Sequence, residues 1–267
     1  MPTAYPELNR VLAELVAGAR AVLGENFVGA YLQGSFAVGD ADEHSDVDFL
    51  VVTSRELDET EQEGLRRLHE RLFALETPWA QHLEGSYVPL EQLRHVDPDR
   101  SPWFYFDNGA TEPIWDGHDN TAVVRWSLRE RGAVLAGPAP ASLVDPVSAD
   151  VLRAQVTDDI VAFGDWLRER DGWSVRLQNL VVVTHCRFLQ TLETGMVTSK
   201  REAGEWALGA LDPAWTGLIR QALADRPDPW RKVHEAADEA LVARTLAFVD
   251  YAAEVARGSA GTRRAAR

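Results

Sequence analysis

Two neighbouring stretches decide the fold of this chain: Gly34–Gly39 (GSFAVG) and Ser45–Val52 (SDVDFLVV). The first places a Gly-Ser turn after an apolar segment, and the second begins an apolar strand with Asp46 and Asp48. Side chains alternate between the two faces of a strand, so these carboxylates point the same way. They repel each other unless a cation lies between them, and hard oxygen ligands of this kind suit Mg²⁺. The turn offers backbone N–H groups and a hydroxyl to phosphate oxygens.

Each part of this pattern has an ordinary interpretation when it stands alone. A lone Gly-Ser is usually a turn, and a lone Asp-x-Asp is usually a solvated strand end. Their combination in this order, followed by an apolar strand, is far more specific and is the apparatus of nucleotidyl transfer. It resembles the signature of the DNA polymerase β-like nucleotidyltransferases, which is Gly-Ser, a short spacer and then Asp-x-Asp.

The composition narrows the class of protein. The chain has 267 residues, 45% apolar and 26% charged, as is typical of soluble globular proteins. A net charge of −15 disfavours a nucleic-acid surface and is compatible with a cationic substrate, although many proteins are acidic for solubility alone. Cys186 is the only cysteine, which excludes an intramolecular disulfide and a cysteine zinc cluster. With no signal-peptide pattern and no membrane-length apolar run, we expect a cytoplasmic monomer that binds neither nucleic acid nor membrane.

The periodicity predicts two domains. Helical spacing runs from Pro6 to Gly24, and we expect strands over 27–33, 47–53 and 79–88, helices over 56–75 and 120–131, and a short apolar segment over 133–136. The Gly- and Pro-rich stretch 137–142 is the candidate linker. Beyond it we expect helices over 148–170, 175–194, 199–211, 213–224 and 229–257. The predicted domains are therefore 1–140, with strands and helices, and 147–257, a helical bundle, followed by a disordered tail over 258–267.

A third carboxylate, Glu84, lies on the third predicted strand. Nucleotidyl transfer to a hydroxyl requires that hydroxyl to lose its proton as it attacks the α-phosphate, so a nearby carboxylate could act as the base or complete the metal site. The ordinary alternative is a solvated glutamate on a strand, which the sequence alone slightly favours.

Basic residues in the second half are candidate phosphate ligands. Ser199 and Glu202 form a capping box, and Lys200 and Arg201 occupy the first helical turn, where the helix dipole disfavours cations. A phosphate at that helix end would be held by N–H groups and side chains together, whereas the alternative is a pair of exposed basic residues. Arg187 lies in a mostly apolar segment and needs a partner, either a structural carboxylate or a nucleotide phosphate.

Taken together, these residues resemble the streptomycin/spectinomycin (aminoglycoside) adenylyltransferases, which move AMP from ATP to an aminoglycoside hydroxyl. The resemblance covers most of the chain, and its specific segments are 34–35 with 45–48, 83–84, 135–138 with 145–147, 187–200 and 206–207. It implies an α+β fold, with a mixed-sheet polymerase β-like domain followed by an all-α bundle. It also implies Mg²⁺ on Asp46 and Asp48, Glu84 as the base and a possible third metal ligand, and ATP contacts from Gly34, Ser35, Ser45, Arg187 and Lys200.

The acceptor site is matched less closely. A Trp and an Asp five positions apart help to bind streptomycin in that family, and Trp166 and Asp171 have this spacing, but their alignment requires a two-residue gap before Arg187. A further acidic contact of the family falls near 176–177, which is not acidic here. Trp103 belongs to an aromatic segment that could line a pocket, although such clusters are more often core.

The sequence therefore predicts a Mg²⁺-dependent adenylyltransferase acting on a small, hydroxylated and cationic molecule, with an aminoglycoside as the best candidate. One alternative is the same chemistry on a protein or RNA acceptor, as in toxin-like relatives of the fold. Another is a nucleotide-binding regulator without catalysis. The three carboxylates argue against the regulator, and the acidic balance argues mildly against RNA.

Overall fold

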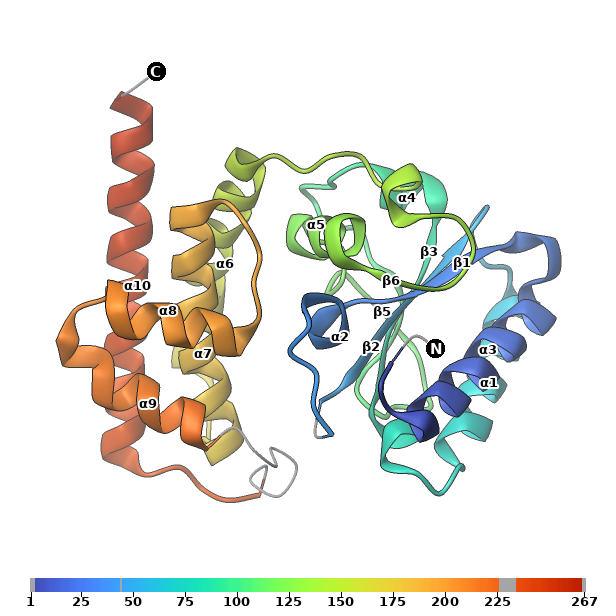
Figure 1. The fold of residues 1–267 in the computed structure, drawn as a ribbon, viewed down its shortest axis with the longest axis horizontal. Coiled ribbons are helices and arrows are strands. Elements are labelled where there is room, and N and C mark those ends of the chain that lie inside the picture. Colours follow the sequence, from blue (N-terminus) through green and yellow to red (C-terminus); the bar gives the residue numbers. More distant parts are fainter. Residues whose placement is uncertain (1–2, 44, 226–233, 266–267) are drawn as a thin grey trace. The chain divides into compact units, whose positions relative to one another are not determined.

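The computed structural model of the protein describes residues 3–43, 45–225 and 234–265, with side chains up to residue 258. The chain divides into two compact units, Met1–Val147 and Ser148–Arg267 (Figure 1). The boundary lies beyond the expected end of the first domain at residue 140. Leu143 and Val144 are buried in a hydrophobic cluster of the first unit, so the stretch after the predicted linker still belongs to that unit.

A six-stranded mixed sheet forms the centre of the first unit, in the order β5-β4-β3-β2-β1-β6. Its strands are β1 (Phe27–Leu32), β2 (Val47–Thr53), β3 (Leu83–Pro89), β4 (Trp103–Phe106), β5 (Ile114–Asp116) and β6 (Ala133–Ala136). Strands β2 and β3 are parallel, and every other neighbouring pair is antiparallel. The mixed sheet expected from the sequence is therefore present.

One face of the sheet is covered by α1 (Pro6–Leu23) and α3 (Glu59–Phe73), which lie side by side (Figure 1). Pro6 begins α1, Gly24 ends it with a positive φ of 52°, and an Asp58–Glu61 capping box begins α3. The two helices pack closely because Gly18 faces Leu68: a Cβ on Gly18 would lie 2.2 Å from Leu68 Cδ1. The apolar side of both helices and alternate residues of the strands form the larger core cluster.

The other face of the sheet is covered by a smaller cluster that includes Leu93 of α4 (Leu90–Arg94) and Leu128 of α5 (Ala122–Arg131). A short helix, α2 (Gly34–Val38), follows β1 directly, where the sequence predicted a simple turn. Three 3₁₀ turns complete the unit: η1 (Gly24–Asn26), η2 (Pro78–His82) and η3 (Pro140–Ser142).

Two features of the sheet differ from the sequence expectation. The segment expected to begin a strand at Trp79 forms η2 up to His82, and β3 begins only at Leu83. Pro78 fixes the first residue of that turn, and Trp79 is buried in it. Strands β4 and β5 were not expected. All four residues of β4 are buried, so it shows no polar alternation, and β5 has only three residues.

The second unit is helical, as expected. Its helices are α6 (Ala149–Glu169), α7 (Val175–Thr194), α8 (Lys200–Ala210), α9 (Thr216–Ala224) and α10 (Glu239–Ala265), and the turn η4 (Pro213–Trp215) precedes α9. Helix α7 contacts the other four, and Leu167, Val181 and Val249 form a core between α6, α7 and α10. Among the helices in the described ranges, none combines the length and apolar character needed to cross a bilayer.

The last helix differs from the expected range 229–257 at both ends. Residues 226–233 lie outside the described residues, and residues 235–237 pair with 173–175 in an extended bridge before Asp238 caps α10. The tail expected to be disordered from Gly258 is helical up to Ala265, and residues 266–267 again lie outside the described part. The stretch continues the long helix α10 although it contains Gly258 and Gly261, and the cations Arg263 and Arg264 suit the C-terminal end of a helix.

Candidate active site

The predicted carboxylates meet at one end of the paired strands β2 and β3. Asp46 and Asp48 are half-buried and alternate with Val47 and Phe49, which are fully buried in the larger core cluster. In the parallel register Asp48 lies directly beside Glu84. The sequence placed Asp46 and Asp48 on one face and Glu84 on the following strand, and the register adds that Glu84 is the neighbour of Asp48.

The Gly-Ser segment lies against the same carboxylates. Gly34 has a positive φ of 56°, and a Cβ added to it would lie 1.8 Å from Asp48 Oδ2. Only glycine fits there, because any side chain would collide with the carboxylate. The backbone N–H of Gln33 donates to Asp48 O at 2.9 Å, which fixes the end of β1 against β2. Gly34 and Ser35 are thus held beside the predicted metal ligands.

Glu84 is largely buried, with a side chain 16% exposed. Tyr105 Oη donates to Glu84 Oε1 at 2.6 Å, and His118 Nε2 lies 3.6 Å from the same oxygen. Burial raises the pKa of Glu84, the nearby charges of Asp46 and Asp119 raise it further, and Tyr105 and His118 oppose this. A carboxylate with a raised pKa is a stronger base than an exposed one.

Asp46 and Ser45 are fixed by local polar contacts. Asp46 Oδ1 accepts from Asn108 Nδ2 at 2.6 Å, and Asn108 Oδ1 lies 2.9 Å from His82 Nδ1. Ser45 Oγ accepts from Asp42 N at 2.9 Å. These contacts set the course of the loop that leads into β2.

Three contributors to this site were missed by the sequence analysis: Tyr105, Asn108 and Asp119. Tyr105 and Asn108 belonged to a segment read only as aromatic. Asp119 lies in the loop before α5 and is 6% exposed, and its carboxylate accepts from Ser86 Oγ at 2.7 Å and from Gln33 Nε2 at 3.1 Å. Burial raises the pKa of Asp119, and nearby His118 and these two hydrogen bonds oppose the rise. The only sequence signal that Tyr105, Asn108 and Asp119 share is that each is a polar residue within or after an aromatic segment.

The donor set fits Mg²⁺ in its chemistry, since it contains oxygen ligands only. No group of three or more His, Cys, Asp or Glu side chains able to hold a metal ion occurs within the described ranges. Mg²⁺ usually takes one or two carboxylates and completes its shell with water and substrate phosphates. Asp46 and Asp48 could supply that pair, and Glu84 lies beside Asp48 in the strand register.

The predicted site residues of the second unit lie on three helices. Arg187 is half-buried on α7, and Lys200 is half-buried at the first position of α8, where Ser199 caps the helix by accepting from Glu202 N at 3.0 Å. Trp166, near the end of α6, is 46% exposed, and the Arg170 guanidinium lies 4.9 Å from its ring centroid. Asp171 is exposed just beyond that helix.

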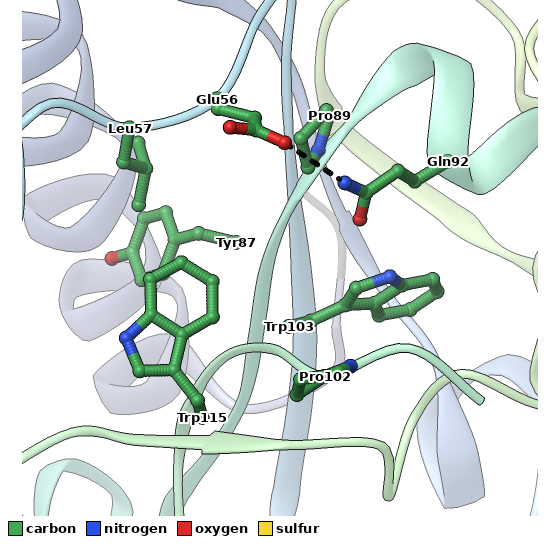
Figure 2. Close-up of a pocket in the computed structure, with 8 residues that line it drawn as sticks. All are labelled: Glu56, Leu57, Tyr87, Pro89, Gln92, Pro102, Trp103 and Trp115. Carbon is green, nitrogen blue, oxygen red and sulfur yellow. Dashed lines mark hydrogen bonds between the residues drawn. The ribbon is translucent and has the colours of Figure 1, made fainter. Parts of the chain in front are cut away.

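Trp103 is in the core, 1% exposed, with the Arg125 guanidinium 5.2 Å from its ring centroid. It borders a cavity of about 320 Å³ at the far end of β3 from Glu84, which Figure 2 shows between the aromatic rings. The lining residues are Glu56, Leu57, Tyr87, Pro89, Gln92, Pro102, Trp103 and Trp115. The cavity contains none of the three predicted carboxylates, and the burial of Trp103 favours a core role over substrate contact.

Comparison with known families places both units. Residues 20–88 match the family model described as "Nucleotidyltransferase domain". Residues 142–253 match the model described as "Aminoglycoside adenylyltransferase, C-terminal domain". The first match ends with β3 and so includes the Gly-Ser segment, both aspartates and Glu84.

Curated and solved proteins agree with these matches. The chain is 29% identical over 252 residues to a spectinomycin 9-adenylyltransferase of Staphylococcus aureus, covering 86% of this chain and 88% of the relative. It is 26% identical over 230 residues to an aminoglycoside (3'') (9) adenylyltransferase of Escherichia coli, covering 81% and 84%. The crystal structure of spectinomycin adenyltransferase AAD(9) from Enterococcus faecialis with ATP and spectinomycin has a similar fold, with a TM-score of 0.70, 15% identity and coverage of 92% and 98%.

Proposed function

We propose that this chain, which resembles the aminoglycoside adenylyltransferases in both of its units, transfers AMP from ATP to a hydroxyl of an aminoglycoside antibiotic and releases pyrophosphate. One observation carries the proposal: Asp48 and Glu84 lie side by side on parallel strands, with Gly34 packed against Asp48. This proximity supports the proposal, in which Gly34 belongs to a phosphate-binding turn, Asp48 is a metal ligand and Glu84 is the base.

The nucleotide is assigned to the residues around that turn. We propose that Gly34 and Ser35 contact the phosphates through backbone N–H groups and the Ser35 hydroxyl. The Ser45 hydroxyl, which holds Asp42 here, would join them. Mg²⁺, held by Asp46 and Asp48 with Glu84 as a possible third ligand, would neutralise charge on the phosphates.

Two residues of the second unit complete the proposed ATP contacts. Arg187 and Lys200 both lie on helices and are half-buried, and each carries a cation suited to phosphate oxygens. The basic residue in the first turn of α8 places its charge beside the N–H groups of a capped helix end, where an anion is favoured.

Glu84 is the proposed general base. Its carboxylate would take the proton of the acceptor hydroxyl as that oxygen attacks the α-phosphorus and the bond to pyrophosphate breaks. The raised pKa of Glu84 suits this role, because a base works best when its pKa lies near the operating pH, and the pKa of an exposed glutamate lies further below it. The hydrogen bond from Tyr105 leaves the other carboxylate oxygen available to a substrate.

The acceptor is proposed from the relatives and from charge. The named activities of the two curated relatives concern spectinomycin and aminoglycosides, and a net charge of −15 suits a cationic molecule. Trp166 and Asp171 are both exposed and keep their proposed role in acceptor binding. The cytoplasmic location and the monomeric state also remain predictions.

The test is a screen of spectinomycin, streptomycin and other aminoglycosides with ATP and Mg²⁺, read by mass spectrometry. We expect one or more acceptors to gain the mass of one AMP group, with pyrophosphate formed in equal amount. Labelled ATP is incubated in parallel with cell extract. Label in protein or RNA, with every small molecule unchanged, would replace the proposal by a macromolecular acceptor, and binding of ATP without any transfer would favour a regulator.

A further inference from the structure

Asp119 is a buried carboxylate to which the proposed chemistry gives no role. It lies between β5 and the start of α5, and the side chains that it contacts are almost fully buried, with Ser86 0% and Gln33 4% exposed. Asp119 Oδ2 accepts from Ser86 Oγ at 2.7 Å, and Oδ1 accepts from Gln33 Nε2 at 3.1 Å. One carboxylate therefore joins β1 and β3 to the loop before α5.

Gln33 and Ser86, the two hydrogen-bond partners of Asp119, are close in sequence to the proposed phosphate-binding turn and to the proposed base. Gln33 immediately precedes Gly34, its N–H donates to Asp48 O at 2.9 Å, and its carbonyl accepts from Ala37 N at 3.3 Å within α2. Ser86 follows Glu84 by two positions on β3, so both side chains point to the same face of the sheet. A shift of Asp119 would thus be transmitted to the phosphate turn and to the base.

Such a carboxylate is costly to bury. The two hydrogen bonds that hold it come from neutral groups, and burial raises its pKa against the opposing effects of nearby His118 and of those hydrogen bonds. Buried carboxylates that serve stability alone usually have a charged partner, as Glu61 does in the same unit, where Arg55 donates to both carboxylate oxygens at 2.9 Å. A buried charge held by neutral donors beside the site suggests a functional reason for its presence.

We infer that Asp119 is a positioning residue that holds the Gly34–Ser35 turn and the strand of Glu84 in their relative places. This inference rests on the proposed function, which gives the turn and Glu84 their roles. Asp119 touches neither nucleotide nor acceptor in this assignment. It acts through Gln33 on the turn and through Ser86 on the base, and small misplacements of reacting groups are enough to slow a reaction strongly.

The test compares Asp119→Ala, the conservative Asp119→Asn and the control Glu61→Ala, which removes a buried carboxylate from the opposite end of β2. We expect Asp119→Ala to lower kcat per folded molecule by about 10- to 100-fold while the acceptor KM changes by less than about 3-fold. Asp119→Asn, which keeps an oxygen for Gln33, should recover part of kcat. Adding Ser86→Ala to Asp119→Ala should cost less than the two single effects combined, because they share one contact. Glu61→Ala should lower the melting temperature and leave kcat unchanged.

A second readout does not depend on transfer. Hydrogen exchange of the Ala37, Gly39 and Asp40 amides, which are bonded within the turn, should accelerate in Asp119→Ala and not in Glu61→Ala. Failure of the wild type to adenylylate any acceptor would remove the proposed function, while faster exchange in Asp119→Ala would still support the positioning role of Asp119. Unchanged exchange and unchanged kcat in Asp119→Ala, or an equal loss of kcat in Glu61→Ala, would overturn the inference.

Discussion

The two ends of strand β2 bury carboxylates in opposite ways. Beyond its C-terminal end, the Glu61 carboxylate accepts hydrogen bonds from both terminal nitrogens of the Arg55 guanidinium, from the Asn26 amide and from the Asp58 N–H. At its N-terminal end, Glu84 accepts a hydrogen bond from Tyr105 and Asp119 accepts from Ser86 and Gln33, which are all neutral donors, and His118 lies 3.6 Å from Glu84. At the C-terminal end, the Glu61 carboxylate is fully paired and caps α3. The other end holds its carboxylates without an arginine or lysine partner among these contacts, and burial raises the pKa of Glu84 and of Asp119 there.

This difference separates stability from function within one sheet. A buried carboxylate that serves only the stability of the fold is usually paired with a cation, because an unpaired buried charge destabilises the folded state. Where a carboxylate must hold a metal or take a proton, its charge has to remain available to the substrate. We therefore expect mutations at the N-terminal, acidic end of β2 to change activity and mutations at the Arg55 end to change stability.

The largest effect is expected at the acidic end. Asp48→Asn or Asp46→Asn removes a ligand charge that Mg²⁺ needs, so transfer should fall to the rate of the enzyme-free control while the fold remains intact. Steady-state assays at saturating Mg²⁺, with circular dichroism melting, measure both. Asp58→Asn, which replaces one good helix cap by another at the opposite end, is the control and should keep full activity. Near-wild-type turnover in either acidic-end variant would remove the metal assignment.

A second effect is expected at His69 of α3, which stacks between Phe49 of β2 and Phe106 of β4 and whose pKa is lowered to about 3 by burial. The unfolded chain, with an ordinary histidine pKa near 6.5, binds the proton first, so the stability from the neutral ring is lost as pH falls below about 6.5. Relative to His69→Phe, the wild type should lose on the order of 3 kcal/mol of unfolding free energy between pH 6.5 and 4.

Urea unfolding of both proteins at several pH values measures this difference, and the titrations of all other groups cancel in the comparison. His185 offers the same test in the second unit, because burial there lowers its pKa to about 4. Parallel stability curves for the wild type and His69→Phe would show that the ring is not buried in its neutral form.

A smaller loss is expected at the Arg55 end. Glu61→Ala removes half of the capping box together with the contacts to Arg55 and Asn26, and should lower the unfolding free energy by about 2 kcal/mol. The Arg55 side chain is 56% exposed, so solvent limits the ion-pair part of this loss. Denaturant midpoints at pH 7 measure the loss of stability in Glu61→Ala, and transfer rates per folded molecule show whether its activity is unchanged. A large drop in transfer rate would erase the distinction between the two ends.

The smallest effect concerns the second unit. If Lys200 contacts ATP, Lys200→Ala should weaken nucleotide binding about tenfold and reduce the ATP-induced rise in melting temperature by about 3 °C, with little change in the apo value. Arg201→Ala is the matched control, since this neighbouring side chain is exposed and pairs with Glu205 at 3.8 Å. An ATP response equal to the wild type in both variants would take Lys200 out of the site.

The strong periodic segments could be predicted from the sequence. Strand β2 and helix α7 have the expected bounds, because both combine long apolar patterns with clear end signals. The buried strand β4 and the short β5 were missed, since one lacks alternation and the other lacks length. The true start of β3 was also missed, because the apolar Trp79 belongs to a 3₁₀ turn and not to the strand.

The candidate site was predictable where the chemistry lies in a compact motif. Asp46, Asp48 and Gly34 are close in sequence, and the resemblance added Glu84, which the strand register places beside Asp48. Asp119 is 33 residues from Ser86 and 86 from Gln33, so only the folded sheet brings it to the site. Trp103 shows the converse, because an aromatic segment is compatible with a pocket but is more often core, and Trp103 is buried in the core here.

Single-turnover transfer in Glu84→Gln, measured beside an ATP–Mg²⁺ titration, decides whether Glu84 is the base of a nucleotidyl transfer at the acidic end of the sheet. We expect nearly normal nucleotide binding, because Asp46 and Asp48 still hold the metal, and a loss of transfer by a factor on the order of 10² to 10⁴. Binding lost as severely as in Asp46→Asn would make Glu84 chiefly a metal ligand. Transfer at the wild-type rate would contradict the claim outright.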